Sequence, residues 1–380
     1  MNLELNETHK IIRDTAREFA KAELSHDADL RDEKEIFPSE AIKKLGDLGF
    51  MGIMIPEKYN GAGLDTISYT IAMEEICKVD ASVGVIMSVN NSLVCYGLNE
   101  FGNEFQKEKY LKDLASGKKL GAFALSEPEA GSDATNQRTT AKKDGDYYIL
   151  NGIKNWITNG LHCDYVIVMA AVNPELGPRG IGAFIVEKNF EGFTVGKKER
   201  KLGIRSSDTT SLLFQDVKIP KENLIGDESF GFKFAMKTLD GGRIGIASQA
   251  LGIAQACLDA SIKYSKERKA FDKPISELQA IQFKLSEMST NIAAARLLIY
   301  NAASLKDAHK NYTKEAAMAK LFASKIAVSS ALEAIQIHGG YGYIREYNVE
   351  RYLRDAKITE IYEGTSEIQK IVIARSLLKN

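Results

Sequence analysis

The chain has 380 residues, of which 44% are hydrophobic and 27% are charged, and its formal net charge is -1. This length predicts two or three domains with a large hydrophobic core. The nearly balanced charge argues against a nucleic-acid partner and against binding to an anionic membrane surface.

Cysteine usage and the N-terminal sequence bear on the compartment. No CxxC pair occurs, which predicts reduced thiols with packing roles in a cytoplasmic protein rather than a disulfide framework. The first residues, MNLELNETHK, lack a basic stretch followed by an apolar one, and no uninterrupted apolar run is long enough to span a bilayer. We therefore expect a soluble protein without a membrane segment. The four cysteines are Cys77, Cys95, Cys163 and Cys257.

Helical patterns dominate residues 1–119, which we predict to form an N-terminal α-helical domain. Asn6 is a suitable N-cap for an amphipathic first helix, and Gly49 is a suitable stop for a short second helix. Loop composition interrupts the helices at residues 59–64. The predicted helices cover residues 6–24, 39–48 and, as one or two buried helices, 68–94, with a further helix ending near 115–117.

Short β-type runs separated by turn residues replace the helical period in residues 120–225. The runs are AFAL, YYILNG, DYVIVMAAV, GIGAFIVE and SLLFQDVKI. Because no helix-length crossover separates them, we expect a central antiparallel β domain rather than a doubly wound parallel sheet.

Long helices return in residues 226–380 and predict a C-terminal four-helix bundle. Two of them cover residues 231–265 and 277–307, and a third runs from a Thr313 cap to a stop at Gly339-Gly340. Ser366 and Gln369 form a capping-box pattern that places the start of the last helix near Ser366. The predicted fold is α+β and multidomain, in the order helical, β, helical.

Several catalytic and metal-binding motifs are missing from the sequence. We find no GxGxxG after a strand, no GxxxxGK[ST], no HExxH and no GxSxG. These gaps argue against a nicotinamide-binding Rossmann unit, a P-loop enzyme, a zinc protease and an α/β-hydrolase. The histidines show no metal-ligand spacing, so no metal is expected; they are residues 9, 26, 162, 309 and 338.

Three carboxylates in the stretch ITEIYEGTSEIQ are candidates for acid–base chemistry. Glu367 falls in the first turn of the last helix, where it complements the helix dipole, and Glu360 follows a polar helical run as an ordinary solvated acid. Glu363 lies instead on a non-helical joint between Tyr362 and Gly364, where an aromatic wall and a missing side chain leave room for a ligand. We predict Glu363 as the general base.

Two more stretches combine small, hydroxyl and aromatic residues. FALSEPEAGSD, residues 123–133, has a strand entering a loop rich in backbone donors, and WITN, residues 156–159, holds the only tryptophan. Such groups suit a planar polar heterocycle. By themselves they fit a buried strand aromatic and an ordinary polar turn equally well.

Five motifs, in this order and spacing, resemble the acyl-CoA dehydrogenase family, with its short-chain, butyryl-CoA branch the most similar. They are FALSEPEAGSD, NWITNG, LDGGRIGIASQALGIAQ, QIHGGYGY and ITEIYEGTSEIQ. The resemblance implies an acyl-CoA dehydrogenase-like fold, FAD as cofactor and a homotetramer. It also implies α,β-dehydrogenation of a short-chain acyl-CoA thioester, with electrons passing to electron-transfer flavoprotein.

The resemblance assigns cofactor and substrate contacts residue by residue. Thr158 matches a position near flavin N5, and Ser132 matches one that touches both FAD and the pantetheine part of the substrate. The pair Asp240 and Arg243 matches substrate-binding positions on the helix that lines the CoA channel, although its spacing alone also fits a surface ion pair. The flavin positions are Phe123, Leu125, Ser126, Ser132, Trp156, Ile157 and Thr158. The adenosine and pyrophosphate positions, partly across a subunit interface, are Arg268, Phe271, Gln279, Gln336, Gly339, Gly340, Thr365 and Glu367.

The resemblance also places the catalytic base at Glu363, between Tyr362 and the substrate contact Gly364. Some branches of the family carry the base at the position of Gly242, and glycine cannot serve. Asp272 stands where the family commonly has glycine, which makes the loop around Phe271 less certain unless Asp272 points away or pairs with Lys269 or Lys273. His338 is interpreted as a packing or cofactor-rim residue.

Two alternatives to a dehydrogenase stay open. An acyl-CoA oxidase would use the same base but let oxygen reach the reduced flavin, and a non-catalytic scaffold would keep the fold alone. The sequence leaves open the acyl chain length and the direction, oxidation or enoyl-CoA reduction.

Overall fold

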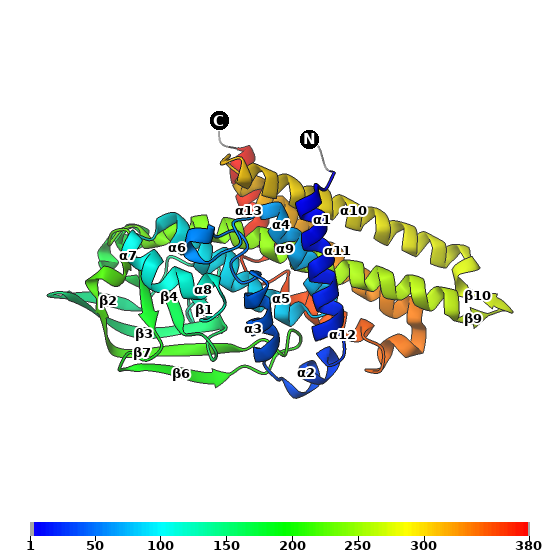
Figure 1. Cartoon of the computed structure of the whole chain (residues 1–380), viewed down its shortest axis with the longest axis horizontal. Helices are drawn as coiled ribbons and strands as arrows, with labels where there is room; N and C mark the ends of the chain where they lie inside the picture. Colours follow the sequence, from blue (N-terminus) through cyan, green and yellow to red (C-terminus); the bar gives the residue numbers. More distant parts are fainter. Residues whose placement is uncertain (1–3, 379–380) are drawn as a thin grey trace.

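A computed structural model of the chain describes residues 4–378. Helices come first, a β-sheet follows, and long helices close the chain (Figure 1). This order confirms the predicted α+β fold. The outer ends of the predicted 1–119 and 226–380 domains, residues 1–3 and 379–380, lie outside the described part, as do the first three residues of MNLELNETHK.

The first helices follow the predicted positions closely. The Asn6 side chain accepts a hydrogen bond from the His9 backbone at 2.8 Å and caps α1. After α1 the chain continues through π-helical turns to Leu24, as it does again at Val89–Cys95 and Lys107–Leu111. The helices are α1 Glu7–Phe19, α2 Ala28–Lys34, α3 Ser39–Asp47, α4 Thr66–Cys77, α5 Ala81–Ser88, α6 Tyr96–Phe101, α7 Glu104–Gln106 and α8 Lys112–Ala115.

The central sheet is mixed, so the predicted purely antiparallel arrangement is wrong in detail. Its order is β6-β7-β3-β2-β4-β5-β8, and β1 pairs with β4. One edge of β4 is shared by β1, which pairs along residues 165–168, and by β2, which touches Ala171; both run parallel to β4. The strands are β1 Gly121–Ala124, β2 Thr140–Asp144, β3 Tyr147–Thr158, β4 Tyr165–Ala171, β5 Ile181–Glu187, β6 Phe193–Lys198, β7 Thr209–Pro220 and β8 Leu224–Ile225.

The last part contains five helices and a small hairpin. They are α9 Gly231–Glu267, the hairpin β9 Lys269–Ala270 and β10 Lys273–Pro274, α10 Gln279–Asp307, α11 Thr313–His338, α12 Val349–Ile358 and α13 Ser366–Leu377. Two predicted caps were wrong. The hydroxyl of Thr365, not Ser366, accepts from the Ile368 backbone at 3.3 Å, and the Thr313 hydroxyl donates to Asp240 rather than capping α11.

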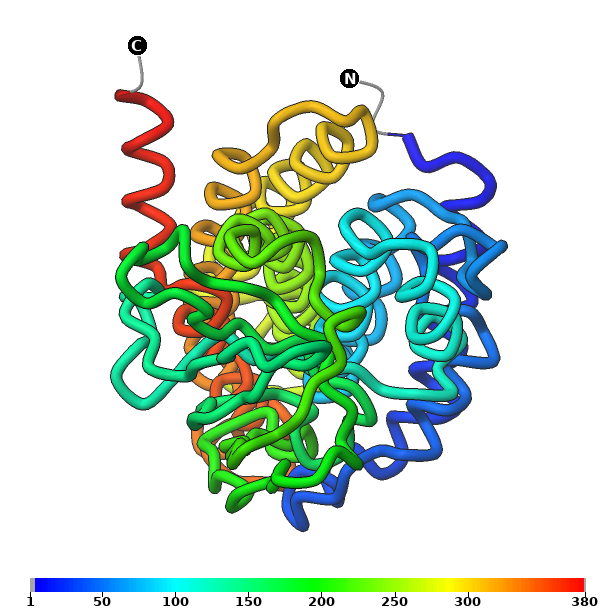
Figure 2. Tube along the Cα trace, turned by 90° about the vertical axis from the view of Figure 1, so that its left-hand side faces the viewer, coloured from blue at the N-terminus to red at the C-terminus, as the bar shows by residue number. Residues whose placement is uncertain are grey.

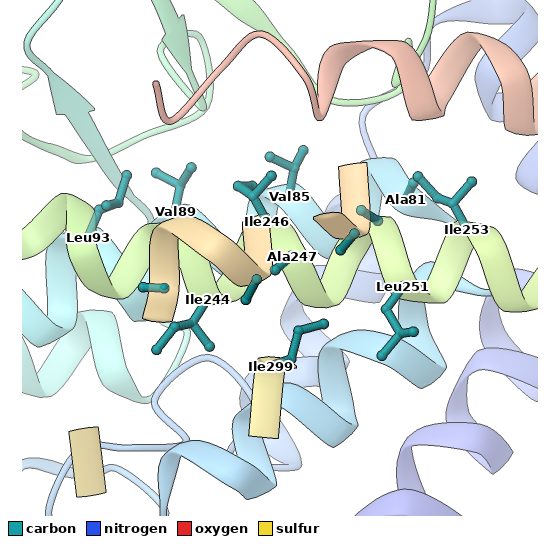
Figure 3. Packing of buried hydrophobic residues seen from close by; sticks show 14 of the residues in the cluster. Ala81, Val85, Val89, Leu93, Ile244, Ile246, Ala247, Leu251, Ile253 and Ile299 are labelled. Atoms are coloured by element: carbon teal, nitrogen blue, oxygen red, sulfur yellow. The ribbon is translucent and has the colours of Figure 1, made fainter. Parts of the chain in front are cut away.

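Helix α9 is the central element of the protein. It contacts α4 and α5 on one side and α10 and α11 on the other, and Figure 2 shows it between the N-terminal and the C-terminal helices. Residues Ile244, Ile246 and Leu251 of α9 pack among aliphatic residues of α5, the following π-helical turns and α10 (Figure 3). Packing on all sides explains why residues 241–254 of α9 are buried on every face instead of along one apolar stripe.

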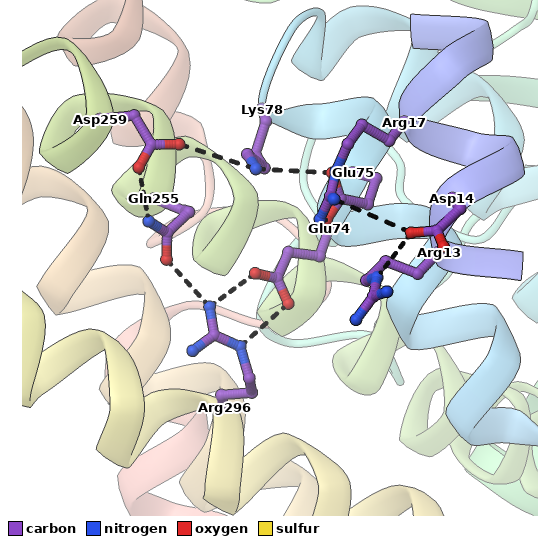
Figure 4. Close-up of polar contacts among 9 residues, drawn as sticks. All are labelled: Arg13, Asp14, Arg17, Glu74, Glu75, Lys78, Gln255, Asp259 and Arg296. Carbon is purple, nitrogen blue, oxygen red and sulfur yellow. Dashed lines mark hydrogen bonds and ion pairs between the residues drawn. The ribbon is translucent and has the colours of Figure 1, made fainter. Parts of the chain in front are cut away.

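Polar contacts also join α9 and α4 to α10, and α4 to α1. Arg296 of α10 lies 2.6 Å from Glu74 of α4 and donates to Gln255 of α9 at 3.0 Å, while Arg17 of α1 lies 3.0 Å from Glu75 (Figure 4). Three helices that are distant in sequence, α1, α4 and α10, therefore have a defined register relative to one another and to α9.

Among the described residues, one helical stretch, Ala81–Phe101, is long and apolar enough to cross a membrane by length and composition. The sequence had not predicted it, because polar residues interrupt its apolar run. Of its most apolar window, 94% is buried inside the protein. A core helix of a soluble protein passes the same test, so this finding is weak evidence for a membrane span.

Candidate active site

The chain between α12 and α13 forms a joint with left-handed backbone. Glu363 has φ 54° and Gly364 has φ 87°. The Gly364 carbonyl accepts from Lys320 Nζ and from Gln369 Nε2, each at 2.8 Å, and Gln369 Nε2 also lies 3.2 Å from the Glu363 carbonyl. A non-glycine residue at positive φ is strained unless its surroundings hold it, and these donors supply that support.

The Glu363 carboxylate lies where a charged group is poorly solvated. Its Oε2 is buried and makes no hydrogen bond to any described residue. Burial raises the pKa of Glu363 to about 7, against the opposing effect of the cations Lys320 and then Arg243. A carboxyl group with this pKa and a free oxygen is suited to accept a proton near neutral pH.

Helix α9 leaves space for this carboxylate by carrying glycine at position 242. A Cβ atom at Gly242 would lie 2.9 Å from Glu363 Oε2 and 2.8 Å from Leu93 Cδ2. The structure therefore brings the predicted base into contact with the helix that holds Asp240 and Arg243. It also shows that a larger residue at 242 and a glutamate at 363 compete for the same volume.

Buried polar groups surround the joint. The Tyr362 hydroxyl donates to Gln249 Oε1, and Gln249 donates to the Ala81 carbonyl at 2.8 Å. Nearby, the hydroxyls of Tyr69 and Ser88 lie 2.9 Å apart. Sequence reasoning missed Gln249, Tyr69 and Ser88, as it missed Lys320 and Gln369. The only available signal was polar residues inside otherwise apolar helices.

Asp240 and Arg243 form an internal pair rather than a surface pair. Their side chains lie 2.5 Å apart, and Arg243 is only 6% exposed. Asp240 also accepts a hydrogen bond from the Thr313 hydroxyl at 2.6 Å, which joins α9 to the start of α11. Because the Nε of Arg243 is buried without a partner among the described residues, this guanidinium retains a donor for a ligand.

The two predicted flavin stretches meet in the β domain. Ser126 O accepts from the Asn155 backbone at 2.9 Å, next to Trp156, which has φ 63° and is 60% exposed. The pairing of β3 with β7 shifts between Lys154 and Ile157, and this irregularity presents Trp156 outward. Phe123, Leu125 and Ile157 are buried, Thr158 is half-buried, and Ser126 is half-buried at the start of the loop that leads to exposed Ser132.

A buried ion pair anchors this loop. Lys154 Nζ lies 2.7 Å from Glu127 Oε1 and 3.0 Å from the Leu125 carbonyl, and neither side chain is more than 3% exposed. Glu127 in turn accepts from the backbone of Arg138 at 2.6 Å and of Thr139 at 3.1 Å. The pair thus ties the two ends of residues 125–139 to β3.

We expect Lys154→Met to destabilise the protein by about 3–5 kcal/mol, because it leaves a buried carboxylate without its cation. The measurement is urea unfolding of the purified variant. The double variant Lys154→Met with Glu127→Gln is the control and should recover part of the loss. Equal stability of Lys154→Met and the unaltered protein would contradict a structural role for the pair.

A third group of predicted residues surrounds a cavity at the far end of α11. Arg268, Gly339 and Gly340 line this cavity of about 440 Å³, together with His338 and Tyr341. A Cβ at either glycine would meet nothing within 4 Å. His338 is buried, stacks on Tyr264 at 4.2 Å and donates from its Nδ1 to the Ala334 carbonyl at 2.7 Å, and burial lowers its pKa.

Phe271 and Asp272 form the tip of the β9-β10 hairpin, at the end of the long helices opposite the β domain (Figure 1). Both have left-handed backbone, with φ 53° and 62°, as a two-residue type I′ turn requires. Asp272 therefore adopts the conformation that glycine would supply, which aspartate tolerates better than most residues. It makes no ion pair with Lys269 or Lys273 in the described part of the chain.

Phe271 is 85% exposed, and Gln279 and Gln336 are exposed outside the cavity lining.

Thr365 and Glu367 lie with the Glu363 joint rather than with this cavity. The joint contacts Lys320, and 18 residues of α11 separate Lys320 from His338, a distance of about 27 Å along the helix. Within one chain the predicted adenosine and pyrophosphate positions therefore form two groups.

Comparisons with known proteins match this arrangement along the whole chain. Models described as acyl-CoA dehydrogenase N-terminal, middle and C-terminal domains match residues 6–118, 122–217 and 230–378. The short-chain specific acyl-CoA dehydrogenase of Mus musculus is 52% identical over 379 residues, covering 100% of this chain and 92% of the relative.

Two solved structures have the same fold over their full length. The butyryl-CoA dehydrogenase of Megasphaera elsdenii has a TM-score of 0.99 at 48% identity, with 100% of both chains covered. A chain from a structure of the electron transferring flavoprotein of Acidaminococcus fermentans has a TM-score of 0.99 at 50% identity, again with 100% of both chains covered.

Proposed function

The chain belongs to the acyl-CoA dehydrogenase family, and on that premise we propose that it catalyses FAD-dependent α,β-dehydrogenation of short-chain acyl-CoA thioesters. Butyryl-CoA to crotonyl-CoA is the reference reaction, in either direction. The similar proteins named as short-chain and butyryl-CoA dehydrogenases support this substrate class.

The single observation that carries the proposal is the environment of Glu363. Its carboxyl group has a pKa of about 7, a buried oxygen that no described residue hydrogen-bonds, and a glycine opposite it on α9. In the proposed role Glu363 takes the proton from the substrate α-carbon, a weak carbon acid that needs a base with raised basicity. The backbone N–H of Glu363 is the proposed donor to the thioester oxygen, where negative charge develops.

The β-domain residues fit the flavin ring of FAD. The outward indole of Trp156 can cover a planar ring, and the half-buried Thr158 and the start of the loop at Ser126 offer hydroxyl and backbone donors to its edge. When bound, FAD supplies the acceptor for the hydride that leaves the substrate β-carbon. Phe123, Leu125, Ile157 and Ser132 complete the proposed contacts.

Substrate binding is proposed for residues on two sides of Glu363. Asp240 and Arg243 of α9 offer a carboxylate and a guanidinium with a free donor, and Ser132 offers a hydroxyl from the β domain. Tyr362 and Gly364 flank the base and limit where the acyl group can lie. This arrangement orients the α-carbon toward Glu363.

We propose a homotetramer, and the division of the adenosine-side residues supports an assembly in which two chains share one cofactor site. Arg268, Phe271, Gln279, Gln336, Gly339 and Gly340 belong to one end of the long helices, and Thr365 and Glu367 to the other. One cofactor can contact both groups if two chains contribute to its site. We propose this shared site, with the exposed Phe271 covered in the assembly.

Electron-transfer flavoprotein is the proposed electron partner, and the cytoplasm the proposed location. The likeness to a chain from a structure of such a flavoprotein supports the first. Four buried, unpaired cysteines support a reducing compartment. The domain limits 1–119, 120–225 and 226–380 are likewise proposed.

We expect kcat/KM for butyryl-CoA to rise with pH through about 7, because Glu363 must be deprotonated to act as base and burial raises its pKa. Below that pH the value should fall about tenfold per unit. The measurement is initial rate against pH with an artificial electron acceptor. A flat profile between pH 5 and 9 would contradict the assignment.

Anaerobic titration of the purified protein with saturated acyl-CoAs tests the proposed function. Butyryl-CoA should bleach the flavin absorbance more completely than long-chain acyl-CoAs. A colourless protein, or yellow protein that butyryl-CoA leaves unchanged, would indicate a non-catalytic scaffold. Peroxide formed in air at the rate of substrate loss would indicate an oxidase.

A further inference from the structure

Lys320 of α11 is a fully buried lysine directly under the Glu363 joint. Its side chain is 0% exposed, and its Nζ donates to the Gly364 carbonyl at 2.8 Å. Lysine is almost never fully buried unless a partner compensates its charge. No carboxylate lies within ion-pair distance of this Nζ in the described residues, so the compensation comes from the joint itself.

The charges around Lys320 and Glu363 are coupled. Burial lowers the pKa of Lys320 to about 8. Among the neighbouring charges, Glu363 opposes this lowering of the pKa most strongly, and Glu360 and Glu367 oppose it less. Arg243 lowers the pKa further. Conversely, Lys320 and then Arg243 oppose the raised pKa of Glu363. The neighbouring phenols Tyr69 and Tyr362 have raised pKa values and stay neutral. The ammonium group of Lys320 and the ionised form of Glu363 therefore stabilise each other.

We propose that Lys320 is a positioning residue for Glu363: its ammonium group clamps the Gly364 carbonyl, fixes the left-handed joint and favours the ionised form of the neighbouring carboxylate. The inference rests on the proposed role of Glu363 as base. It differs from a packing role because removing the charge changes a titration as well as stability.

The first test compares Lys320→Met with the unaltered protein over pH 5 to 9. Loss of the ammonium charge disfavours the carboxylate, so the acid limb of kcat/KM should move up by about one pH unit. The rate should then fall about fivefold at pH 7 and recover by pH 9.

Lys201→Met is a matched control. Lys201 also donates to a backbone carbonyl, that of Ser207, at 2.6 Å, and burial lowers its pKa to about 8. The acid limb of the kcat/KM profile of Lys201→Met should lie at the same pH as that of the unaltered protein.

A second measurement does not depend on turnover. Infrared titration of the carboxyl band that Glu363→Gln removes should give a higher midpoint in Lys320→Met. If Lys320→Met does not fold, the reciprocal experiment uses Glu363→Gln: loss of the carboxylate should lower the midpoint of Lys320, followed by NMR of labelled lysine.

The outcomes separate this inference from the proposed function. An unchanged acid limb and unchanged infrared midpoint in Lys320→Met, or an unchanged Lys320 midpoint in Glu363→Gln, would overturn the role of Lys320. A uniform loss of rate at every pH would also overturn it, because that result indicates a structural defect alone. Failure of butyryl-CoA to reduce the flavin of the unaltered protein would instead disprove the proposed function. The infrared titration would still test the electrostatic coupling between Lys320 and Glu363.

Discussion

Glu363→Gln is expected to keep FAD and acyl-CoA bound while lowering turnover by about 10²- to 10⁴-fold. The amide has nearly the same shape as the carboxyl group but cannot accept the α-proton. Because the buried Glu363 Oε2 makes no hydrogen bond to a described residue, the substitution breaks no hydrogen bond of that atom. The measurements are flavin content, the dissociation constant for crotonyl-CoA and the rate of flavin reduction by butyryl-CoA.

Glu360→Gln is the matched control for this experiment. Glu360 lies on the same stretch but pairs with Lys357 at 2.7 Å in an exposed contact. Surface pairs of this kind contribute about 0–1 kcal/mol, so the control should keep its turnover and stability. Near-normal turnover of Glu363→Gln would remove Glu363 from the mechanism.

Local signals in the sequence were enough to find the joint but not what holds it. Helix rules excluded Glu360 and Glu367 and left Glu363 outside any helix, and the structure places Glu363 at φ 54°. Lys320 and Gln369, which hold the joint, are ordinary polar residues on helices in the sequence. Their roles depend on tertiary packing of α11 and α13 against the joint, which no local pattern encodes.

The β-sheet also shows how far local sequence patterns can predict the structure. Short β-type runs between turn residues predicted β1, β3, β4, β5 and β7, but not the short or exposed β2, β6 and β8. Strand direction depends on which edges meet in the fold: residues 125–139, which carry the binding loop, join β1 to β2, and both strands run parallel to β4 along one edge. The ion pair of Lys154 with Glu127 that fastens this connection joins residues 27 positions apart.

Gly242→Ala is expected to lower turnover by up to about 10²-fold, because a misplaced catalytic group loses its attack geometry. The new methyl group would lie 2.9 Å from Glu363 Oε2 and 2.8 Å from Leu93 Cδ2, so the carboxylate must move. Stability should change little or fall slightly, since the gain of about 1 kcal/mol of alanine over glycine inside a helix offsets only part of the crowding. Turnover and urea unfolding measured on the same preparation separate the two effects.

Gly241→Ala tests whether the loss arises from helix α9 or from the base. A Cβ at Gly241 meets nothing closer than 3.6 Å, so this neighbour should gain helix stability and keep its turnover. A double-variant cycle then identifies the target. If Gly242→Ala acts by displacing the carboxylate, it should cost little further activity in the Glu363→Gln background, because the displaced group no longer contributes. Additive losses in the double variant would show that residue 242 affects turnover through another contact. The close approach of residue 242 to the Glu363 carboxylate would then not explain the loss of turnover.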